Sequence, residues 1–117
     1  MDEAQFLFFR GSTPTLELVL PLAVDPEDVV YLTMSQQNRA VVEYAMNGTP
    51  LPAGSGQLRR AEEDENVLLL TMSQADTLAL ETGDVELQVR LKNTVGADTF
   101  QPVTGRVGPS LKEGVIG

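Results

Sequence analysis

The sequence contains no cysteine, no histidine and no tryptophan. Without cysteine the chain can form no disulfide, no thiolate nucleophile and no cysteine-ligated zinc site. Without histidine it can build neither a serine–histidine–aspartate triad nor an imidazole metal site. The aromatic side chains are 2 tyrosines and 4 phenylalanines, which leaves few rings for stacking on a sugar. We therefore expect no enzymatic activity, no catalytic residue and no bound cofactor.

Basic residues are also scarce, because 8 lysines and arginines stand against 17 aspartates and glutamates, a net charge of −9. Nucleic acids and anionic membranes are bound by clustered positive charge, so neither is an expected partner. The chain starts Met1-Asp2-Glu3, unlike the basic start of a signal peptide, and apolar runs such as 67–70 are too short to span a bilayer. We expect the protein to be made and kept in the cytoplasm, at least until it joins something larger.

Strict alternation of apolar and polar side chains is the strongest local pattern. Residues 15–20 place Leu16, Leu18 and Leu20 on one face, and residues 85–92 alternate without a break. This period of two is typical of a strand with one buried and one wet face. Other apolar runs, separated by proline, glycine and asparagine, indicate further strands at residues 5–9, 29–35, 40–45, 65–72 and 99–107.

About seven short strands with frequent turns predict an all-β fold, a single antiparallel β-sandwich that spans residues 1–117 as one domain. A long loop is expected at about residues 47–65 and a C-terminal tail at about residues 108–117. After one of the strands, Ser73 can cap a single helical turn, with Asp76 close to the positive end of that turn.

The acidic run Glu62–Glu65 raises the question of calcium binding, together with Asp25, Glu27 and Asp28. Calcium takes about six to eight oxygen ligands in a defined geometry. Neighbouring carboxylates on one loop cannot all point at one ion, and the spaced ligands and glycine of an EF-hand loop are missing. We interpret the run as a solvated loop and expect no metal site.

Both ends of the chain are apolar. Phe8 and Phe9 fall on opposite faces of any strand, and Val115 and Ile116 lie in the expected tail. The first segment is either an ordinary strand of the sandwich or an arm that adds to the sheet edge of a neighbouring subunit. We predict a homo-oligomer with Phe8, Phe9, Val115 or Ile116 at the contact. The alternative is a monomer whose tail folds back on its own sandwich.

The order of several motifs resembles a family of small proteins encoded in phage and prophage regions of Firmicutes-type bacteria. The resemblance covers nearly the whole chain and consists of strand and turn patterns: Arg10-Gly11-Ser12-Thr13-Pro14, Val30-Tyr31-Leu32-Thr33-Met34-Ser35-Gln36, Leu70-Thr71-Met72-Ser73-Gln74-Ala75-Asp76-Thr77-Leu78, Val85-Glu86-Leu87-Gln88-Val89-Arg90 and Leu111-Lys112-Glu113-Gly114-Val115-Ile116. The family is immunoglobulin-like and distantly similar to the N-terminal β-domain of phage baseplate upper proteins. It supplies no functional residues that could be carried over to this chain.

The resemblance implies a non-enzymatic structural or assembly protein of a phage or prophage particle, which acts through protein–protein contacts. The implied partners are further copies of the chain and other phage structural proteins. The implied location is the cytoplasm of the host bacterium during assembly, and presence in the finished virion stays open. The alternative is a β-sandwich binding module that recognises a protein or a glycan, and an enzyme is a weaker third interpretation.

Overall fold

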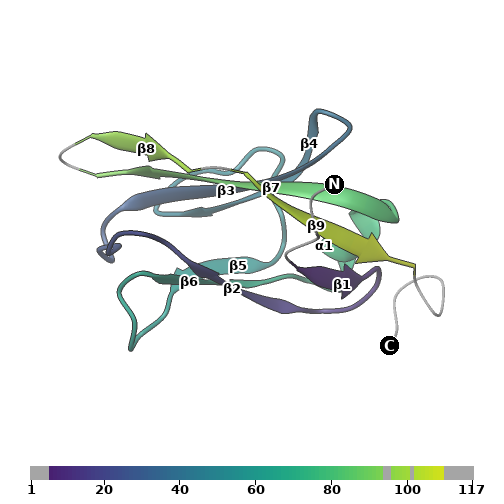
Figure 1. The fold of residues 1–117 in the computed structure, drawn as a ribbon, viewed down its shortest axis with the longest axis horizontal. Helices are drawn as coiled ribbons and strands as arrows, with labels where there is room; N and C mark the ends of the chain where they lie inside the picture. The colour runs from purple at the N-terminus through teal and green to yellow at the C-terminus, as the bar shows by residue number, and fades with distance from the viewer. Residues whose placement is uncertain (1–5, 94–95, 101, 110–117) are drawn as a thin grey trace.

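The computed structural model describes residues 6–93, 96–100 and 102–109. Two β-sheets pack face to face as layers, with one short helix at one end of the sandwich (Figure 1). Within the described residues the elements are β1 (Leu7–Phe9), β2 (Thr15–Val19), β3 (Val29–Gln36), β4 (Arg39–Met46), β5 (Gln57–Arg60), β6 (Val67–Thr71), α1 (Gln74–Ala79), β7 (Gly83–Lys92), β8 (Ala97–Thr99) and β9 (Val103–Gly108).

The larger sheet has six strands in the order β1-β9-β7-β3-β4, with β8 also paired to β7, and the smaller sheet has the order β2-β6-β5. All strand pairs are antiparallel except β1 and β9, which run parallel. β1 lies in the larger sheet, and the chain crosses to β2 in the smaller sheet directly after it. The predicted all-β sandwich is confirmed, with this one parallel pair as an addition.

Two strands were not among those predicted from the sequence. β5 lies inside the predicted loop at residues 47–65, where it pairs with β6. The second is β8, which overlaps the predicted strand 99–107 only at Thr99, whereas β9 forms the part of that strand from Val103 onward. Pro102 stands directly before β9 and has no backbone N–H to donate to a ladder, which explains the break.

The core follows the alternation in the sequence. On β7, Val85, Leu87, Val89 and Leu91 are buried between the sheets, and the residues between them are exposed or half-buried. β3 contributes a second row of inward-facing side chains. β2 differs, because its inward-facing leucines stay partly exposed until Leu20. One side of the sandwich is therefore less completely closed than the rest.

The helix α1 begins where the sequence predicts. Ser73 is its N-cap and accepts a hydrogen bond from the backbone N–H of Asp76 (3.1 Å). Thr77, on the same helix, is fully buried and donates to the carbonyl of Ser12 (2.9 Å), while the N–H of Gly11 donates to the Thr77 hydroxyl (3.0 Å). These bonds attach the turn between β1 and β2 to the helix.

Asp76 also joins three segments that lie far apart in the sequence. Its Oδ2 accepts hydrogen bonds from the hydroxyl of Tyr44 (2.6 Å) and the N–H of Gly56 (2.8 Å), and its Oδ1 accepts one from the N–H of Ser55 (2.9 Å). A Cβ at Gly56 would lie 2.2 Å from the carbonyl oxygen of Thr71, so only glycine allows this approach. We call Asp76, Tyr44, Ser55 and Gly56 the Asp76 junction.

The two acidic groups of the junction have opposite pKa changes. Burial works to raise the pKa of Asp76, but the hydrogen bonds from Tyr44, Ser55 and Gly56 outweigh it and lower that pKa below its ordinary value. Burial, and then the hydrogen bond to the Asp76 carboxylate, raise the pKa of Tyr44. The junction therefore holds a buried carboxylate in its charged form, with the tyrosine neutral beside it.

Candidate functional site

The four predicted contact residues have different positions. Phe8 is buried in the core of its own subunit, with its ring stacked on that of Phe6 at 6.0 Å between centroids. Phe9 is 48% exposed. Val115 and Ile116 lie outside the described residues. Of the two phenylalanines, Phe9 is therefore the one that a neighbouring molecule can reach.

The first segment forms an ordinary strand of its own sandwich rather than a detached arm, because β1 pairs with β9. Leu7 and Phe9 project from the side of β1 opposite to Phe8, and Leu7 is 57% exposed. The ring of Phe9 lies directly over Gly108, where a Cβ would be 2.5 Å from it. We call Leu7 and Phe9 the β1 surface, and its exposed apolar area is suited to a protein contact.

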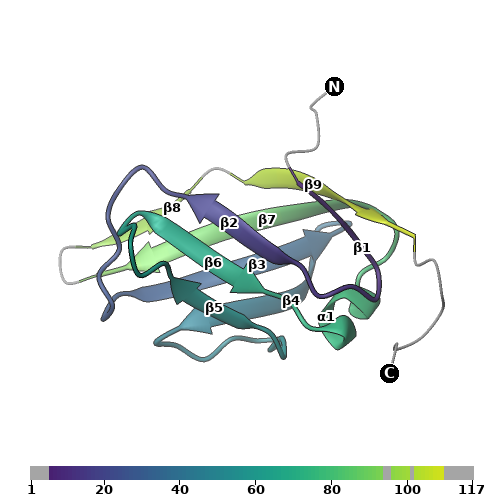
Figure 2. The ribbon, with the colours of Figure 1, turned by 90° about the horizontal axis from the view of Figure 1, so that it is seen from below.

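β2 forms an edge of the smaller sheet, where Figure 2 shows it beside β6. The N–H of Leu20 donates to Asn66 (2.8 Å), and the N–H of Met72 donates to Pro14 (3.0 Å). Because bonding directions alternate along an antiparallel strand, Thr15, Glu17 and Val19 direct their N–H and C=O groups away from β6. No described strand pairs with that side of β2.

Two adjoining hollows, of about 290 and 330 Å³, lie along this free edge where the two sheets separate. Leu16 and Leu18 line them from β2, and Phe6 closes the end next to β1. The opposite wall comes from the larger sheet and the segment before β9: Leu87, Val89, Phe100 and Val103. We call the two hollows the β2 groove, and its lining is mostly apolar.

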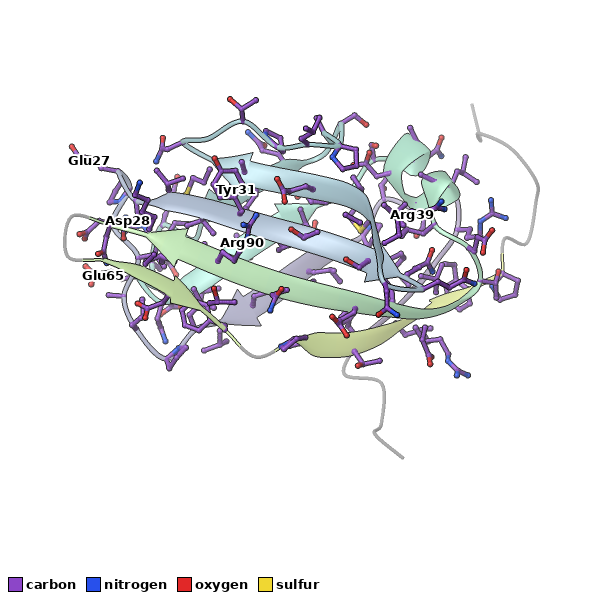
Figure 3. All side chains as sticks on the ribbon, turned by 90° about the horizontal axis from the view of Figure 1, so that it is seen from above. Glu27, Asp28, Tyr31, Arg39, Glu65 and Arg90 are labelled. Atoms are coloured by element: carbon purple, nitrogen blue, oxygen red, sulfur yellow. The ribbon has the colours of Figure 1, made fainter. Side chains whose placement is uncertain are left out.

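The outer face of the larger sheet carries a polar cluster (Figure 3). The guanidinium of Arg90 lies 5.3 Å from the ring centroid of Tyr31 and pairs with the carboxylate of Glu43 at 3.3 Å. Glu43 also accepts hydrogen bonds from the Thr33 hydroxyl (2.7 Å) and the N–H of Leu51 (3.2 Å). The polar groups of this cluster mainly form their ion pair and hydrogen bonds with one another.

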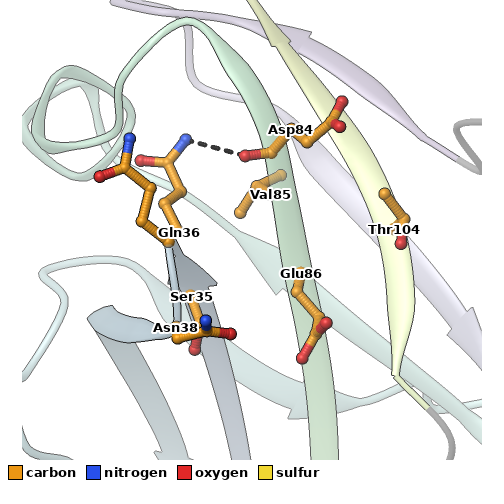
Figure 4. Close-up of a pocket in the computed structure, with 8 residues that line it drawn as sticks. Ser35, Gln36, Asn38, Asp84, Val85, Glu86 and Thr104 are labelled. Atoms are coloured by element: carbon orange, nitrogen blue, oxygen red, sulfur yellow. Dashed lines mark hydrogen bonds between the residues drawn. The ribbon is translucent and has the colours of Figure 1, made fainter.

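A further hollow, of about 270 Å³, lies beside the turn between β3 and β4 (Figure 4). The side-chain amide of Gln36 borders it and donates to the carbonyls of Glu81 (2.8 Å) and Asp84 (3.2 Å). The side-chain Oε1 of Gln36 accepts a hydrogen bond from the backbone N–H of Glu81 (2.9 Å). These bonds fasten the start of β7 to the end of β3, which is a structural role.

The acidic residues do not converge on one point. Residues 62–65 are all exposed. Asp28 is buried, and its Oδ2 accepts a hydrogen bond from the N–H of Asp25 (2.9 Å) within its own turn. In the part of the chain that the structure describes, no group of three or more acidic side chains could hold a metal ion. No helix in the same part is long and apolar enough to cross a membrane.

We expect no change in the melting temperature of the protein when calcium is added or a chelator replaces it. A ligand that binds only the native state must stabilise that state, so a metal site would appear as a shift. Thermal unfolding followed by circular dichroism measures this directly. A reproducible rise at micromolar calcium would contradict this expectation and restore the hypothesis that the Glu62–Glu65 loop binds the ion.

No protein-family model matches the chain, and no curated protein matches it either. Its fold is similar to the crystal structure of CopC from Methylosinus trichosporium OB3b, with a TM-score of 0.56 and 14% sequence identity. The match covers 94% of this chain and 89% of that one. At this identity the similarity supports the all-β, immunoglobulin-like sandwich and shows the fold alone.

In the described part of the chain, the β1 surface and the β2 groove each combine an edge strand with accessible apolar surface. Phe9, in the first, is one of the residues predicted from the sequence, whereas the β2 groove was not predicted. The alternation in residues 15–20 indicates which side chains face inward, and it carries no sign of whether a strand is central or at an edge. Glu17 carries no such sign either, because its side chain belongs to the same alternation and the central strand β7 has Glu86 at an equivalent outward position.

Proposed function

We propose that this chain is a non-enzymatic structural or assembly protein of a phage or prophage particle, which acts through contacts with copies of itself and with other particle proteins. The exposed Leu7 and Phe9 of the β1 surface are the observation that carries this proposal. Large apolar side chains gathered on an edge strand favour association over a monomeric state. The sequence resemblance to phage and prophage proteins supplies the setting, which is the host cytoplasm during assembly.

The absence of histidine and cysteine from the sequence supports a role without catalysis. The described polar groups support it as well, because no buried side-chain nitrogen or oxygen among them lacks a hydrogen-bond partner. Buried polar groups in this sandwich therefore hold the fold together. On this proposal the protein works by shape and surface chemistry, like other components of symmetric assemblies.

We expect the protein to form an oligomer whose population rises with concentration. The double variant Leu7→Ser/Phe9→Ser is expected to be monomeric, because it removes the apolar area of the β1 surface. Light scattering after size exclusion, over a hundredfold range of protein concentration, measures the mass. Leu51→Ser is the matched control, since Leu51 is 83% exposed on another surface and should not affect association.

A chain that lacks residues 110–117 tests the predicted contribution of Val115 and Ile116 in the same experiment. Loss of the oligomer on this deletion would place the tail at the contact together with Phe9. A monomer at every concentration, in the full-length chain, would contradict self-association.

A binding module for a protein or a glycan is the second candidate. Tyr31 favours it, because a ring on the outer face of a sheet can stack on a ligand. Against it, Tyr31 is half-buried, with Arg90 over its ring and the backbone of Gly48 close to its hydroxyl. Ligand binding that is lost in Tyr31→Ala and retained in Leu7→Ser/Phe9→Ser would favour this candidate over the first.

A further inference from the structure

We infer that the free edge of β2 accepts an extended segment of a different protein, in which two apolar side chains flank a basic one. The segment would add a fourth strand to the smaller sheet and fill the β2 groove. This inference deepens the proposed function and rests on it, since it names a second contact and the chemistry of its partner. It concerns a surface separate from the β1 surface.

Backbone hydrogen bonding is the first argument. Glu17 and Val19 present their N–H and C=O groups to the open side of β2, and no described strand uses them. A strand added there would bond to both residues in the manner of β-augmentation, which uses main-chain bonds for affinity. The odd-numbered residues of β2 are available because the even-numbered ones already bond to β6.

The groove supplies the side-chain argument. Side chains of an added strand alternate between the two faces, as they do in β2. The residue opposite Glu17 would lie on the outer face, and the residues before and after it would point into the groove beside Leu16 and Leu18. There they would contact Phe100 and Val103, which line the opposite wall. Such positions favour apolar side chains, because burial of apolar surface is stabilising.

Charge determines which side chain fits opposite Glu17, between the two residues of the added strand that point into the groove. Glu17 is exposed at the centre of the free edge. Beyond Leu20, a neighbouring hollow is bordered by Glu63, Asp64 and Glu65, so the acidic character continues past the end of β2. Opposite charges on directly paired residues stabilise two strands, and like charges destabilise them. A lysine or arginine opposite Glu17 therefore fits, and an acidic residue does not.

A second copy of β2 fits poorly for the same reason. The symmetric antiparallel pairing that uses all the free groups of β2 places Glu17 opposite its own copy. The ends of the chain fit poorly as well. Residues 1–5 include the acidic Asp2 and Glu3. In residues 110–117, Glu113 would share one strand face with Leu111 and Val115, so an acidic side chain would lie between the two apolar ones. These conflicts point to a strand from another protein.

The experiment uses blocked synthetic peptides of sequence Thr-Val-Thr-Leu-Xaa-Leu-Thr-Val, with lysine, serine or glutamate as Xaa. Each peptide is titrated into the isotope-labelled full-length chain, and amide signals are followed by NMR. We expect the lysine peptide to shift the amides of Glu17 and Val19 and to slow their hydrogen exchange. The glutamate peptide is expected to bind at least about fivefold more weakly, from the cross-strand charge pair.

Glu17→Lys is expected to reverse this order of affinities, and Glu17→Pro is expected to abolish binding because it removes the free N–H without affecting the bonds to β6. Glu86→Lys is the matched control, since Glu86 is exposed on the other sheet and the charge change is the same. Thermal melts of each variant confirm that it is folded. If Glu17→Pro does not fold, the Glu17→Lys result decides.

Several results would overturn the inference. They are the absence of any change at the β2 amides with all peptides, changes confined to another surface, or an order of affinities that Glu17→Lys leaves unaltered. A wild-type dimer that Glu17→Pro dissociates would assign the edge to a second copy. Glu17 and Val19 amides that become fast-exchanging only after deletion of residues 1–5 or 110–117 would assign it to the chain itself. If the protein is monomeric and still binds the lysine peptide, the proposed self-association through the β1 surface is wrong and the inference about the β2 edge stands.

Discussion

Replacing Asp76 with alanine is expected to lower the free energy of unfolding by roughly 3–5 kcal/mol. The substitution leaves the hydroxyl of Tyr44 and the N–H groups of Ser55 and Gly56 without their acceptor, and Tyr44 is only 2% exposed. Removing one member of a buried network costs the desolvation of every group left behind. Chemical denaturation at neutral pH measures the loss, and Asp64→Ala, an exposed carboxylate, is the control with an expected change within about 0.5 kcal/mol.

The same carboxylate predicts how stability depends on pH. The folded state lowers the pKa of Asp76 below its ordinary value of 3.8. The charged carboxylate therefore makes its full contribution to the free energy of unfolding at pH values above 3.8. The contribution falls as the pH drops through the lower pKa of the folded state. The stability difference between the wild type and Asp76→Asn should therefore shrink below about pH 4. A difference that stays constant down to acid unfolding would contradict a charged Asp76 in the junction.

Replacing Leu87 with aspartate is expected to lower the free energy of unfolding by roughly 3–5 kcal/mol, a large share of the total stability of a small domain. Leu87 is 1% exposed at the centre of β7. The new carboxylate would lie among apolar side chains of both sheets with no basic partner there. Val89→Asp should behave similarly, since Val89 lies on the same buried face.

Glu86→Ala provides the contrast, because its side chain lies on the exposed face of the same strand. The expected change is within about 0.5 kcal/mol. Denaturant unfolding of Leu87→Asp and Glu86→Ala side by side measures the difference between the two faces. Equal losses from the two variants would contradict the inward and outward assignment of β7.

Local patterns predicted those parts of the fold that depend on neighbouring residues. The alternation from Val85 to Lys92 predicted β7 and its buried face, and Ser73 predicted the start of α1. β5 was missed because Leu58 is the one apolar residue in a polar segment, and the strand forms through its pairing with β6. Tertiary pairing of this kind leaves little trace in a single sequence.

Positions that depend on distant residues could not be predicted. Alternation places Phe8 and Phe9 on opposite faces, but the pairing of β1 with β9 decides which of the two is buried. The partners of Asp76 lie 20 to 32 residues before it, so no local pattern indicated the junction beyond a residue suited to a helix start. The β2 groove depends on which strands lie at edges, which is a property of the complete topology.

The parallel pairing of β1 and β9 has a mechanical consequence. The N–H of Arg106 donates to Phe6 and the N–H of Arg10 donates to Gly108, so the pair is fastened at both of its ends. Because the strands run in the same direction, a pull on the two ends of the chain draws β1 and β9 past each other along their length. Their hydrogen bonds then resist the force together instead of opening one after another. Tension along the chain would therefore meet its main resistance at this pair, and the rate of forced unfolding would depend on it.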